Sequence, residues 1–410
     1  MREVAVTGLG AVTPVGPTWS ESWENLVRGR SGVGRITLFD PSIIPVDIAA
    51  EVSDWDPTRL DRRDVRHLDR STQFALAAAR EAMNSAALKP GDVSPERIGV
   101  LIASAVGGIS TIHAQMEALL RGGYRRVSPH LLPNMLVDSP AAHVALEAHA
   151  RGPNMATVSA CATGSNAIGE AFEIIRRGDA DIVIAGGTEA CITPLFMAGF
   201  CQMRALAKPG ADCPAAACKP FDIRRSGLVV GEGAGVLILE EAGHAAARGA
   251  RVRAMIAGYG STCDAYHMAA PDPGAIGMGE AIRLAIERAG IERDSLGYVS
   301  AHGTGTELND RLEALALRAV LGDAVEDIPT SSTKAATGHM MGASGAVEAA
   351  ISVQVLIDRI APPTLNLEQP DPECRLDHIA RNARAVEAEY VLSDSFGMGG
   401  HNAALVFARV

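Results

Sequence analysis

Short windows of sequence recur in the same order in the two halves of this chain. The paired windows are residues 4–10 with 254–260, 98–104 with 296–301, and 160–164 with 334–338. Each member of the last pair, ACATG and KAATG, is followed by a small-residue-rich helical pattern and then by a strand-like run. Repeats that keep their order indicate a duplicated fold. We therefore expect two related halves, residues 1–250 and 251–410, and insertions in the first half because the offsets between windows differ.

The order of predicted elements is that of a layered α/β protein. Apolar runs at 98–103 and 182–185 are typical of strands that are buried on both faces. Between them, Ile168, Ala171 and Ile175 recur at the spacing of one helix face. Strands that alternate with helices in this way predict stacked layers of sheet and helix.

Composition excludes several classes of protein. Of 410 residues 47% are hydrophobic, enough for a large buried core. The excess of 48 acidic over 37 basic residues gives a net charge of −11, which disfavours a nucleic-acid binder. The N-terminal residues do not follow the pattern of a signal peptide, and no run of about 18 apolar residues predicts a membrane span. Seven cysteines without a CxxC motif favour reduced thiols, so we expect a cytoplasmic protein.

Cys161 is the candidate nucleophile. It stands where an extended run ends in small residues and a helix pattern begins. The N-terminus of a helix stabilises an anion, so this position is expected to lower the thiol pKa from its usual value of about 8.5. The alternative is a buried cysteine that acts as a small hydrophobic side chain.

Two histidines and a lysine lie on loops of similar sequence. His302, in VSAHGTGT, follows a predicted strand, and His339, in STKAATGH, lies on a strand-to-helix loop. The glycines and threonines around them leave room for a ligand. Lys334 is one of only four lysines beside 33 arginines, which indicates a position that needs a compact ammonium group. A Cys-His-His zinc site and purely structural histidines are the alternatives.

A glycine-rich loop, FGMGGHN at 396–402, lies near the C-terminus. It has the glycine content of a phosphate-binding loop but lacks the Lys-Ser/Thr ending of a P-loop. We interpret it as backbone that approaches a substrate closely.

Taken together, these windows resemble the elongating β-ketoacyl-acyl-carrier-protein synthases, type II ketosynthases of the thiolase superfamily with a Cys-His-His triad. The resemblance covers essentially the whole chain and includes GEGAG at 231–235, DAYH at 264–267 and PPTLN at 362–366. It implies the thiolase fold, in which duplicated halves form a five-layer α/β/α/β/α sandwich. It also implies that no metal or organic cofactor is needed, because the substrates are carried on the phosphopantetheine of an acyl carrier protein.

The resemblance implies a role for each motif. Cys161 would hold the acyl chain as a thioester, while His302 and His339 would support decarboxylation of malonyl-acyl-carrier protein, so that the carbanion lengthens the chain by two carbons. Lys334 would give electrostatic support, and the backbone N–H groups of Cys161 and Met398 would form the oxyanion hole. The other implied roles are structural support near the site (Glu348), pantetheine binding (Thr304, Thr306), the gate (Phe396, Met398, Asp264) and the acyl pocket (Val106, Leu131, Phe200).

Two positions depart from the family pattern. Met398 stands where these enzymes commonly have phenylalanine in the gate, and because methionine is flexible we expect a different acyl shape or looser gating. Ser226 stands where aspartate is usual, and the sequence offers no interpretation of it.

The family implies an acidic acyl carrier protein as the partner and a dimer as the assembly. The candidate docking sites are two arginine clusters, one formed by Arg62, Arg63 and Arg66 and the other by Arg125 and Arg126, with an ordinary solvated surface as the alternative.

The leading function is fatty-acid-type elongation by a homodimer. The alternatives are the ketosynthase subunit of a type II polyketide (including polyene) synthase, paired with a chain-length factor, and a non-catalytic scaffold subunit. The presence of all four site residues disfavours the scaffold.

Overall fold

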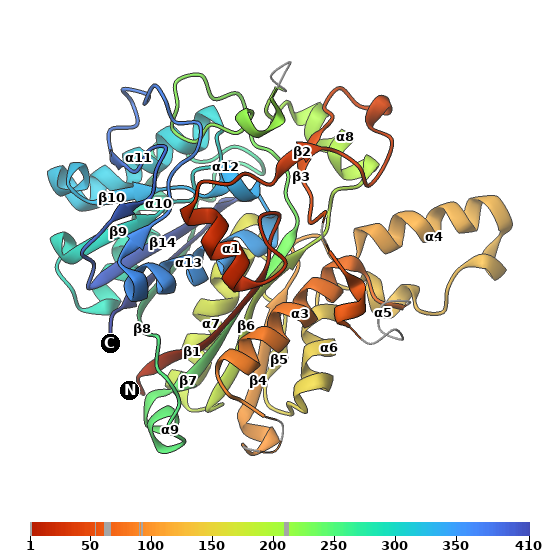
Figure 1. Ribbon diagram of the computed structural model, residues 1–410, viewed down its shortest axis with the longest axis horizontal. Coiled ribbons are helices and arrows are strands. Elements are labelled where there is room, and N and C mark those ends of the chain that lie inside the picture. The colour runs from red at the N-terminus through yellow and green to blue at the C-terminus, as the bar shows by residue number, and fades with distance from the viewer. Residues whose placement is uncertain (1, 54, 61–66, 90, 92, 209–212) are drawn as a thin grey trace.

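The computed structural model describes residues 2–53, 55–60, 67–89, 91, 93–208 and 213–410 (Figure 1). Within these residues eleven strands form one mixed sheet. They are β1 (Val4–Val12), β4 (Ile98–Ala103), β5 (Asn154–Met155), β6 (Ile182–Glu189), β7 (Gly233–Glu241), β8 (Ala254–Cys263), β9 (Leu296–Ser300), β10 (Pro329–Ser331), β12 (Asp377–His378), β14 (Tyr390–Gly397) and β15 (His401–Ala408). Two small sheets pair β2 (Val33–Arg35) with β3 (Ile48–Ala50) and β11 (Ile360–Ala361) with β13 (Arg384–Ala385).

The strand order is the same on either side of the centre of the large sheet. β1 and β8 pair there in antiparallel fashion through three residues each. Outward from β1 the order is β7, β6, β4 and β5, and outward from β8 it is β15, β14, β9 and β10. The repeated windows at 4–10 and 254–260 therefore lie on equivalent strands, as do those at 98–104 and 296–301. This is the duplicated arrangement that the repeats predict, while the division at residue 250 stays a prediction.

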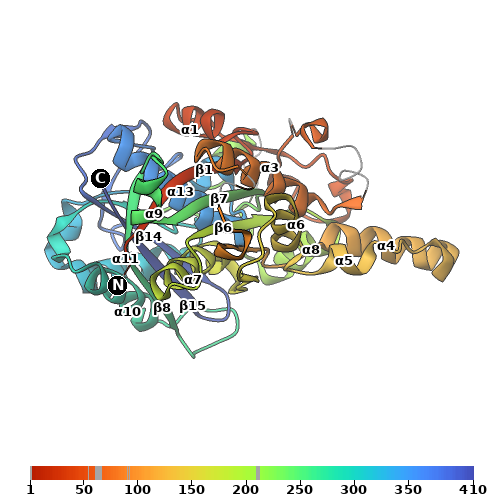
Figure 2. The same cartoon turned by 90° about the horizontal axis from the view of Figure 1, so that it is seen from below.

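Helices cover both faces of each half of the sheet (Figures 1 and 2). α3 (Arg70–Ser85) and α6 (Ser139–Ala148) pack on the outer face of the first half, and α10 (Ile276–Ala289) and α11 (Glu307–Leu321) cover the outer face of the second. α7 (Thr163–Arg177) and α13 (Ser344–Asp358) lie between the two halves, in contact with each other and with strands of both. The result is five layers, in which three layers of helices alternate with the two halves of the sheet. One apolar core lies where each helix layer packs on the sheet. The remaining helices are α1 (Trp19–Val27), α4 (Ile109–Gly122), α5 (Leu131–Met135), α8 (Pro194–Met203), α9 (Ala242–Ala247) and α12 (Lys334–Thr337).

The central position of α13 explains its composition. By length and apolar content alone, the stretch Met341–Asp358 is the one candidate membrane span among the described residues, with a mean hydropathy of 1.2. However, 83% of that stretch is buried inside the protein. A helix that packs against sheet on both sides has no polar face, so the composition reflects a core helix.

α4 and α5 form an arm that extends away from the body of the molecule (Figures 1 and 2). No residue of α4 is buried, and large apolar side chains of the arm, such as Leu120 and Tyr124, are mostly exposed to solvent. The arm therefore gains little stabilisation from the core of its own chain.

Candidate active site

Cys161 lies in a tight turn directly before α7. The preceding residue, Ala160, has φ 51°, a left-handed conformation that strains a non-glycine residue and recurs at functional turns. The glycine-rich loop packs against this turn, because a Cβ atom on Gly397 would lie only 3.0 Å from the Cys161 nitrogen. The Met398 backbone N–H points to the Cys161 thiol. The structure thus brings together the two residues whose N–H groups are expected to form the oxyanion hole.

The thiol of Cys161 is neutral at physiological pH. Burial raises its pKa to about 11, although the Met398 backbone hydrogen bond and the charge of Lys334 act in the opposite direction. The sequence led us to expect a lowered pKa at the N-terminus of α7. The cause of the difference is desolvation, which disfavours the thiolate and outweighs those groups.

His302, after β9, and His339, after α12, both line a cavity over Cys161. Their ring centroids are 5.3 Å apart and their planes are nearly perpendicular, at 88°. Each histidine is only 1% exposed. Burial and the charge of Lys334 lower the pKa of both imidazoles well below 6.5, so both are neutral at physiological pH. Two neutral rings can each offer an N–H group to a substrate oxygen.

Lys334 is completely buried at the start of α12. Its Nζ atom lies 3.3 Å from Nδ1 of His302 and forms an ion pair with Glu348 of α13. An ammonium group has only hydrogens to donate, so Nδ1 of His302 accepts and the proton of the neutral ring lies on Nε2. On the second histidine, Nδ1 of His339 lies 3.0 Å from the Ser344 hydroxyl.

The cavity over Cys161 has a volume of about 450 Å³ and collects most of the expected site residues. Those that line it are Cys161, His302, His339, Thr304, Thr306, Asp264, Phe396, Met398 and Phe200, and Ser226, to which no role was assigned, lines it as well. Val106 does not line it but packs against the apolar cluster around Cys161. Leu131 lies farther away and lines a separate cavity of about 260 Å³ between the start of α3 and the arm.

The expected gate residues differ in position. Phe396 is buried, and its ring packs edge-on to His302 with centroids 5.9 Å apart. Met398 is 36% exposed. Asp264 accepts a hydrogen bond of 2.7 Å from Asn402, and its own backbone N–H donates to the Gly400 carbonyl at 2.9 Å. Met398 and Asp264 thus line the accessible part of the cavity, whereas Phe396 supports the ring of His302.

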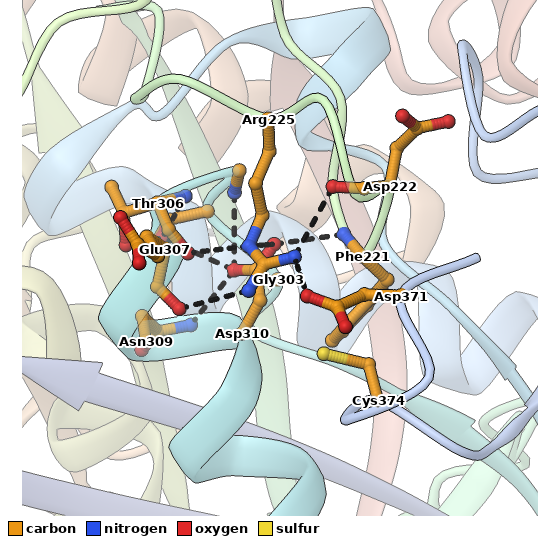
Figure 3. A network of polar contacts seen from close by, with 12 residues as sticks. Phe221, Asp222, Arg225, Gly303, Thr306, Glu307, Asn309, Asp310, Asp371 and Cys374 are labelled. Atoms are coloured by element: carbon orange, nitrogen blue, oxygen red, sulfur yellow. Dashed lines mark hydrogen bonds and ion pairs between the residues drawn. The ribbon is translucent and has the colours of Figure 1, made fainter. Parts of the chain in front are cut away.

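Thr304 and Thr306 lie in the loop after β9, with their hydroxyl oxygens 2.8 Å apart. A buried network holds this loop (Figure 3). Asp310 of α11 accepts hydrogen bonds from the backbone N–H groups of Gly305 and Phe221. The expected pantetheine residues are therefore fixed by a carboxylate that lies under them.

Arg225 is the second centre of that network (Figure 3). It is 3% exposed at its side chain, donates to the carbonyls of Thr306 and Glu307, and pairs with Asp371 at 2.6 Å. Sequence patterns do not single out Arg225 or Asp310, because the contacts that join them to Thr306, Asp371 and Phe221 span more than 80 positions along the chain. Ser226 follows, and its hydroxyl accepts a 3.2 Å hydrogen bond from the Lys208 backbone.

The structure describes only one of the two arginine clusters that are candidate docking sites. Arg62, Arg63 and Arg66 lie outside the described residues. Arg125 and Arg126 are exposed on the arm after α4. A further cation, which was not expected from the sequence, is Arg204, which is exposed after α8 and lines the cavity.

Comparison with known proteins supports the fold and shows the family. The family models of the beta-ketoacyl synthase N-terminal and C-terminal domains match residues 1–245 and 253–368. A 3-oxoacyl-[acyl-carrier-protein] synthase 2 from Synechocystis sp. is 44% identical, covering 100% of this chain and 98% of its own length. A type II polyketide synthase ketosynthase, solved in complex with its acyl-carrier protein, has a TM-score of 0.93 at 33% identity, covering 100% of this chain and 99% of the other. The ishigamide ketosynthase/chain length factor has a TM-score of 0.91 at 34% identity, with the same coverage.

Proposed function

The chain belongs to the beta-ketoacyl synthase family, and we propose that Cys161, His302, His339 and Lys334 carry out its condensation reaction. The reaction is the decarboxylative Claisen condensation of an acyl thioester with malonyl-acyl-carrier protein. Its product is a β-ketoacyl-carrier protein two carbons longer. The observation that carries the proposal is the single cavity in which a nucleophile faces two neutral imidazoles, one of them 3.3 Å from a buried ammonium group.

The first step loads the acyl chain. The sulfur of Cys161 attacks the carbonyl carbon of the acyl-pantetheine thioester. The resulting oxyanion accepts hydrogen bonds from the backbone N–H groups of Cys161 and Met398. Collapse of this intermediate breaks the bond between the carbonyl carbon and the pantetheine sulfur. Since the thiol of Cys161 is protonated beforehand, its proton leaves during the attack and ends on the pantetheine sulfur.

The second step releases carbon dioxide. The bond between the malonyl methylene carbon and its carboxylate breaks, and the electron pair becomes an enolate on the thioester. The N–H groups of neutral His302 and His339 donate to the enolate oxygen, and the charge of Lys334 adds to their effect. The methylene carbon then attacks the Cys161 thioester, the carbon–sulfur bond breaks, and the sulfur takes up one proton from solvent, so that the net reaction consumes one proton.

The carrier-bound substrates would enter between the gate and the threonine loop. Thr304 and Thr306 line that passage and suit hydrogen bonds with the amides of a pantetheine arm. Each step uses only protein groups and carried substrates, so we propose that no metal or organic cofactor takes part. For the acidic carrier protein itself we propose contacts with Arg204 at the cavity and with the arginine clusters, including Arg125 and Arg126.

A second candidate function is that of a ketosynthase subunit in a type II polyketide synthase. It is favoured by Met398 in the gate and by the structural likeness to the type II polyketide synthase ketosynthase and to the ishigamide ketosynthase/chain length factor. The assembly separates the two functions. A homodimer on gel filtration after expression alone supports fatty-acid-type elongation, whereas a protein that becomes soluble and active only with a co-expressed chain-length factor supports the polyketide function.

The experiment that tests the proposal is intact-mass analysis after incubation with a panel of acyl-carrier proteins. We expect a gain of one acyl group that is absent from Cys161→Ala. Addition of malonyl-carrier protein to the loaded protein should then remove the adduct and yield the lengthened β-ketoacyl product. Absence of an adduct from every donor would contradict the role of Cys161, and the identity of the accepted donors separates the two pathways.

A further inference from the structure

Ser159 begins the nucleophile turn, which comprises residues 159–162, and it is held through all three of its polar groups. Its backbone N–H donates to the Thr163 hydroxyl at 2.9 Å, and its carbonyl accepts the Ala162 N–H at 3.1 Å. Its own hydroxyl oxygen accepts the side-chain amide of Asn166 at 2.6 Å. Asn166 lies in the first turn of α7, so its amide ties the nucleophile turn to the body of this helix.

A tyrosine from the second half of the chain holds the Asn166 amide. The Tyr259 hydroxyl, on β8, donates to Oδ1 of Asn166 at 2.8 Å, whereas the Glu170 carboxylate lies farther from it, at 3.4 Å. Tyr259 is buried, and burial raises its pKa above the usual value, so the hydroxyl keeps its proton and remains a donor. With Oδ1 facing Tyr259, the NH₂ group of Asn166 is directed to Ser159. These contacts form a continuous relay from β8 through α7 to the nucleophile turn.

The sequence of α7 leaves space for this tyrosine. Asn166, Gly169 and Glu170 recur at the spacing of one helix face, and all three lie against Tyr259. A Cβ atom on Gly169 would lie only 2.2 Å from a carbon of the Tyr259 ring. Glycine inside a helix is less favourable than alanine, so this position is suited to the ring and not to the helix. Tyr259 therefore fits a notch in α7 that only glycine leaves open.

The relay ends at the strained part of the nucleophile turn. Ala160, between Ser159 and Cys161, has φ 51°, and such a conformation persists only where neighbouring contacts hold it. The Ser159 carbonyl also borders the loop that carries the second expected oxyanion-hole donor, since a Cβ atom on Gly397 would lie 2.7 Å from this oxygen. A shift of Ser159 would therefore disturb both sides of the expected oxyanion hole.

We propose that Tyr259 and Asn166 are positioning residues that hold Ser159 and thereby keep the Cys161 N–H directed at the thioester oxygen. Neither side chain is among the described residues that line the cavity over Cys161, so both act through Ser159 and touch no substrate. The inference rests on the proposed function, because the oxyanion that this N–H would bind forms in the acyl-loading step.

Removal of the relay hydroxyl tests the proposal. Tyr259→Phe keeps the ring in its notch but takes the donor from Oδ1 of Asn166, and we expect the rate constant for acyl loading of Cys161 to fall roughly five- to twentyfold. The carrier-protein concentration that gives the half-maximal rate should not change. Asn166→Ala removes the link itself and should lose roughly ten- to a hundredfold. The double variant should be no slower than Asn166→Ala, because Tyr259 acts through Asn166. Losses that multiply in the double variant would overturn the relay.

Tyr298→Phe is the matched control for a general loss of stability. Tyr298 is also a buried strand tyrosine, on β9, and its hydroxyl lies 2.8 Å from the hydroxyl of Ser331, outside the nucleophile turn. Its removal should lower the thermal midpoint about as much as Tyr259→Phe does, yet keep acyl loading within about twofold of the wild-type rate. Equal losses of loading in the two variants would overturn the positioning role, as would wild-type loading in Tyr259→Phe.

Hydrogen exchange gives a readout that does not depend on catalysis. The Ser159 and Ala162 N–H groups are both hydrogen-bonded at the turn, so a peptide spanning residues 156–164 should exchange faster in the relay variants than in the wild type or Tyr298→Phe. If exchange follows this pattern while the wild type accepts no acyl group, the relay stands and the proposed function fails. If the wild type is loaded and the peptide exchanges equally in all variants, the relay is refuted and the proposed function stands.

Discussion

The ammonium nitrogen of Lys334 lies 3.3 Å from Nδ1 of His302, in a place where neither side chain meets solvent. This contact places the proton of the neutral imidazole on Nε2. Burial lowers the pKa of the ring and the ammonium charge lowers it further, so His302 is a hydrogen-bond donor at neutral pH. Glu348 balances the ammonium charge on its other side. A cation is thereby kept beside the His302 ring without exposure to water.

Removal of the Lys334 ammonium should destabilise the protein. Lys334→Met leaves Glu348 as an unpaired carboxylate in the core, and we expect the free energy of unfolding to fall by about 3–5 kcal/mol. The double variant Lys334→Met/Glu348→Leu removes both charges and should recover most of that loss. Urea unfolding monitored by circular dichroism checks both values. A single variant as stable as the wild type would contradict a buried ion pair.

The rate of Cys161 alkylation should keep rising with pH well into the alkaline range. Burial raises the thiol pKa to about 11, and because the thiolate is the reactive form, its fraction rises about tenfold per pH unit below that value. The rate with iodoacetamide, followed by mass analysis of the Cys161 peptide, is therefore expected to increase from pH 7 to pH 10 without a plateau. Cys161→Ala identifies the adducts of the other cysteines. A plateau below pH 9 would show a thiolate that is stabilised more strongly than burial allows.

A methyl group at Gly397 should disrupt the proposed oxyanion hole. In Gly397→Ala the Cβ atom would lie 2.7 Å from the Ser159 carbonyl oxygen and 3.0 Å from the Cys161 nitrogen, so the two backbones must separate. We expect kcat to fall by roughly a hundredfold or more, as for loss of an oxyanion-hole donor. Gly199→Ala in α8 is the matched control, because its Cβ atom meets no neighbour and alanine favours the helix. Equal activities of the two variants would argue against the close packing of this loop.

Substitution of the gate methionine should change the acyl groups that are accepted. Met398 is partly exposed at the cavity, and a flexible thioether adapts to more shapes than a flat ring does. We expect Met398→Phe to narrow the profile, with the largest loss of kcat/KM for the longest or most rigid donors. The measurement is the loading rate of Cys161 with a series of acyl-carrier proteins. An unchanged profile would show that Met398 does not select substrates.

Much of the fold was predictable because its elements have strong local patterns. The apolar run at 98–103 is β4, and the helical spacing of Ile168, Ala171 and Ile175 belongs to α7, which ends at Arg177 and is capped by Gly178 with φ 86°. The predicted five-layer fold is confirmed by the sandwich and by its likeness to solved ketosynthases. Cys161, His302, His339 and Lys334 could be singled out because each lies in a short motif of small residues, and the structure brings them together, while their catalytic roles stay a prediction.

The supporting residues could not be found in the same way. Asp310 and Glu313 are two charges on a helix, and such residues usually face solvent. Only the tertiary structure shows that they are buried against Arg225 and Asp394, which lie more than 70 positions away along the chain. The expected direction of the Cys161 pKa was wrong for a related reason. The helix start is visible in the sequence, whereas the depth at which the sulfur is buried is not.

The central helix layer also limits how this chain can be divided. α7 comes from the first half of the sequence and α13 from the second, yet both are buried between the two sheets and contact each other. A fragment that contains only one of them would expose the inner face of its own sheet to water. The direct pairing of the two halves, three residues each of β1 and β8, is too short to hold separate fragments together. The two sequence repeats therefore form one cooperative folding unit, and a fragment ending near the middle of the chain should aggregate rather than fold.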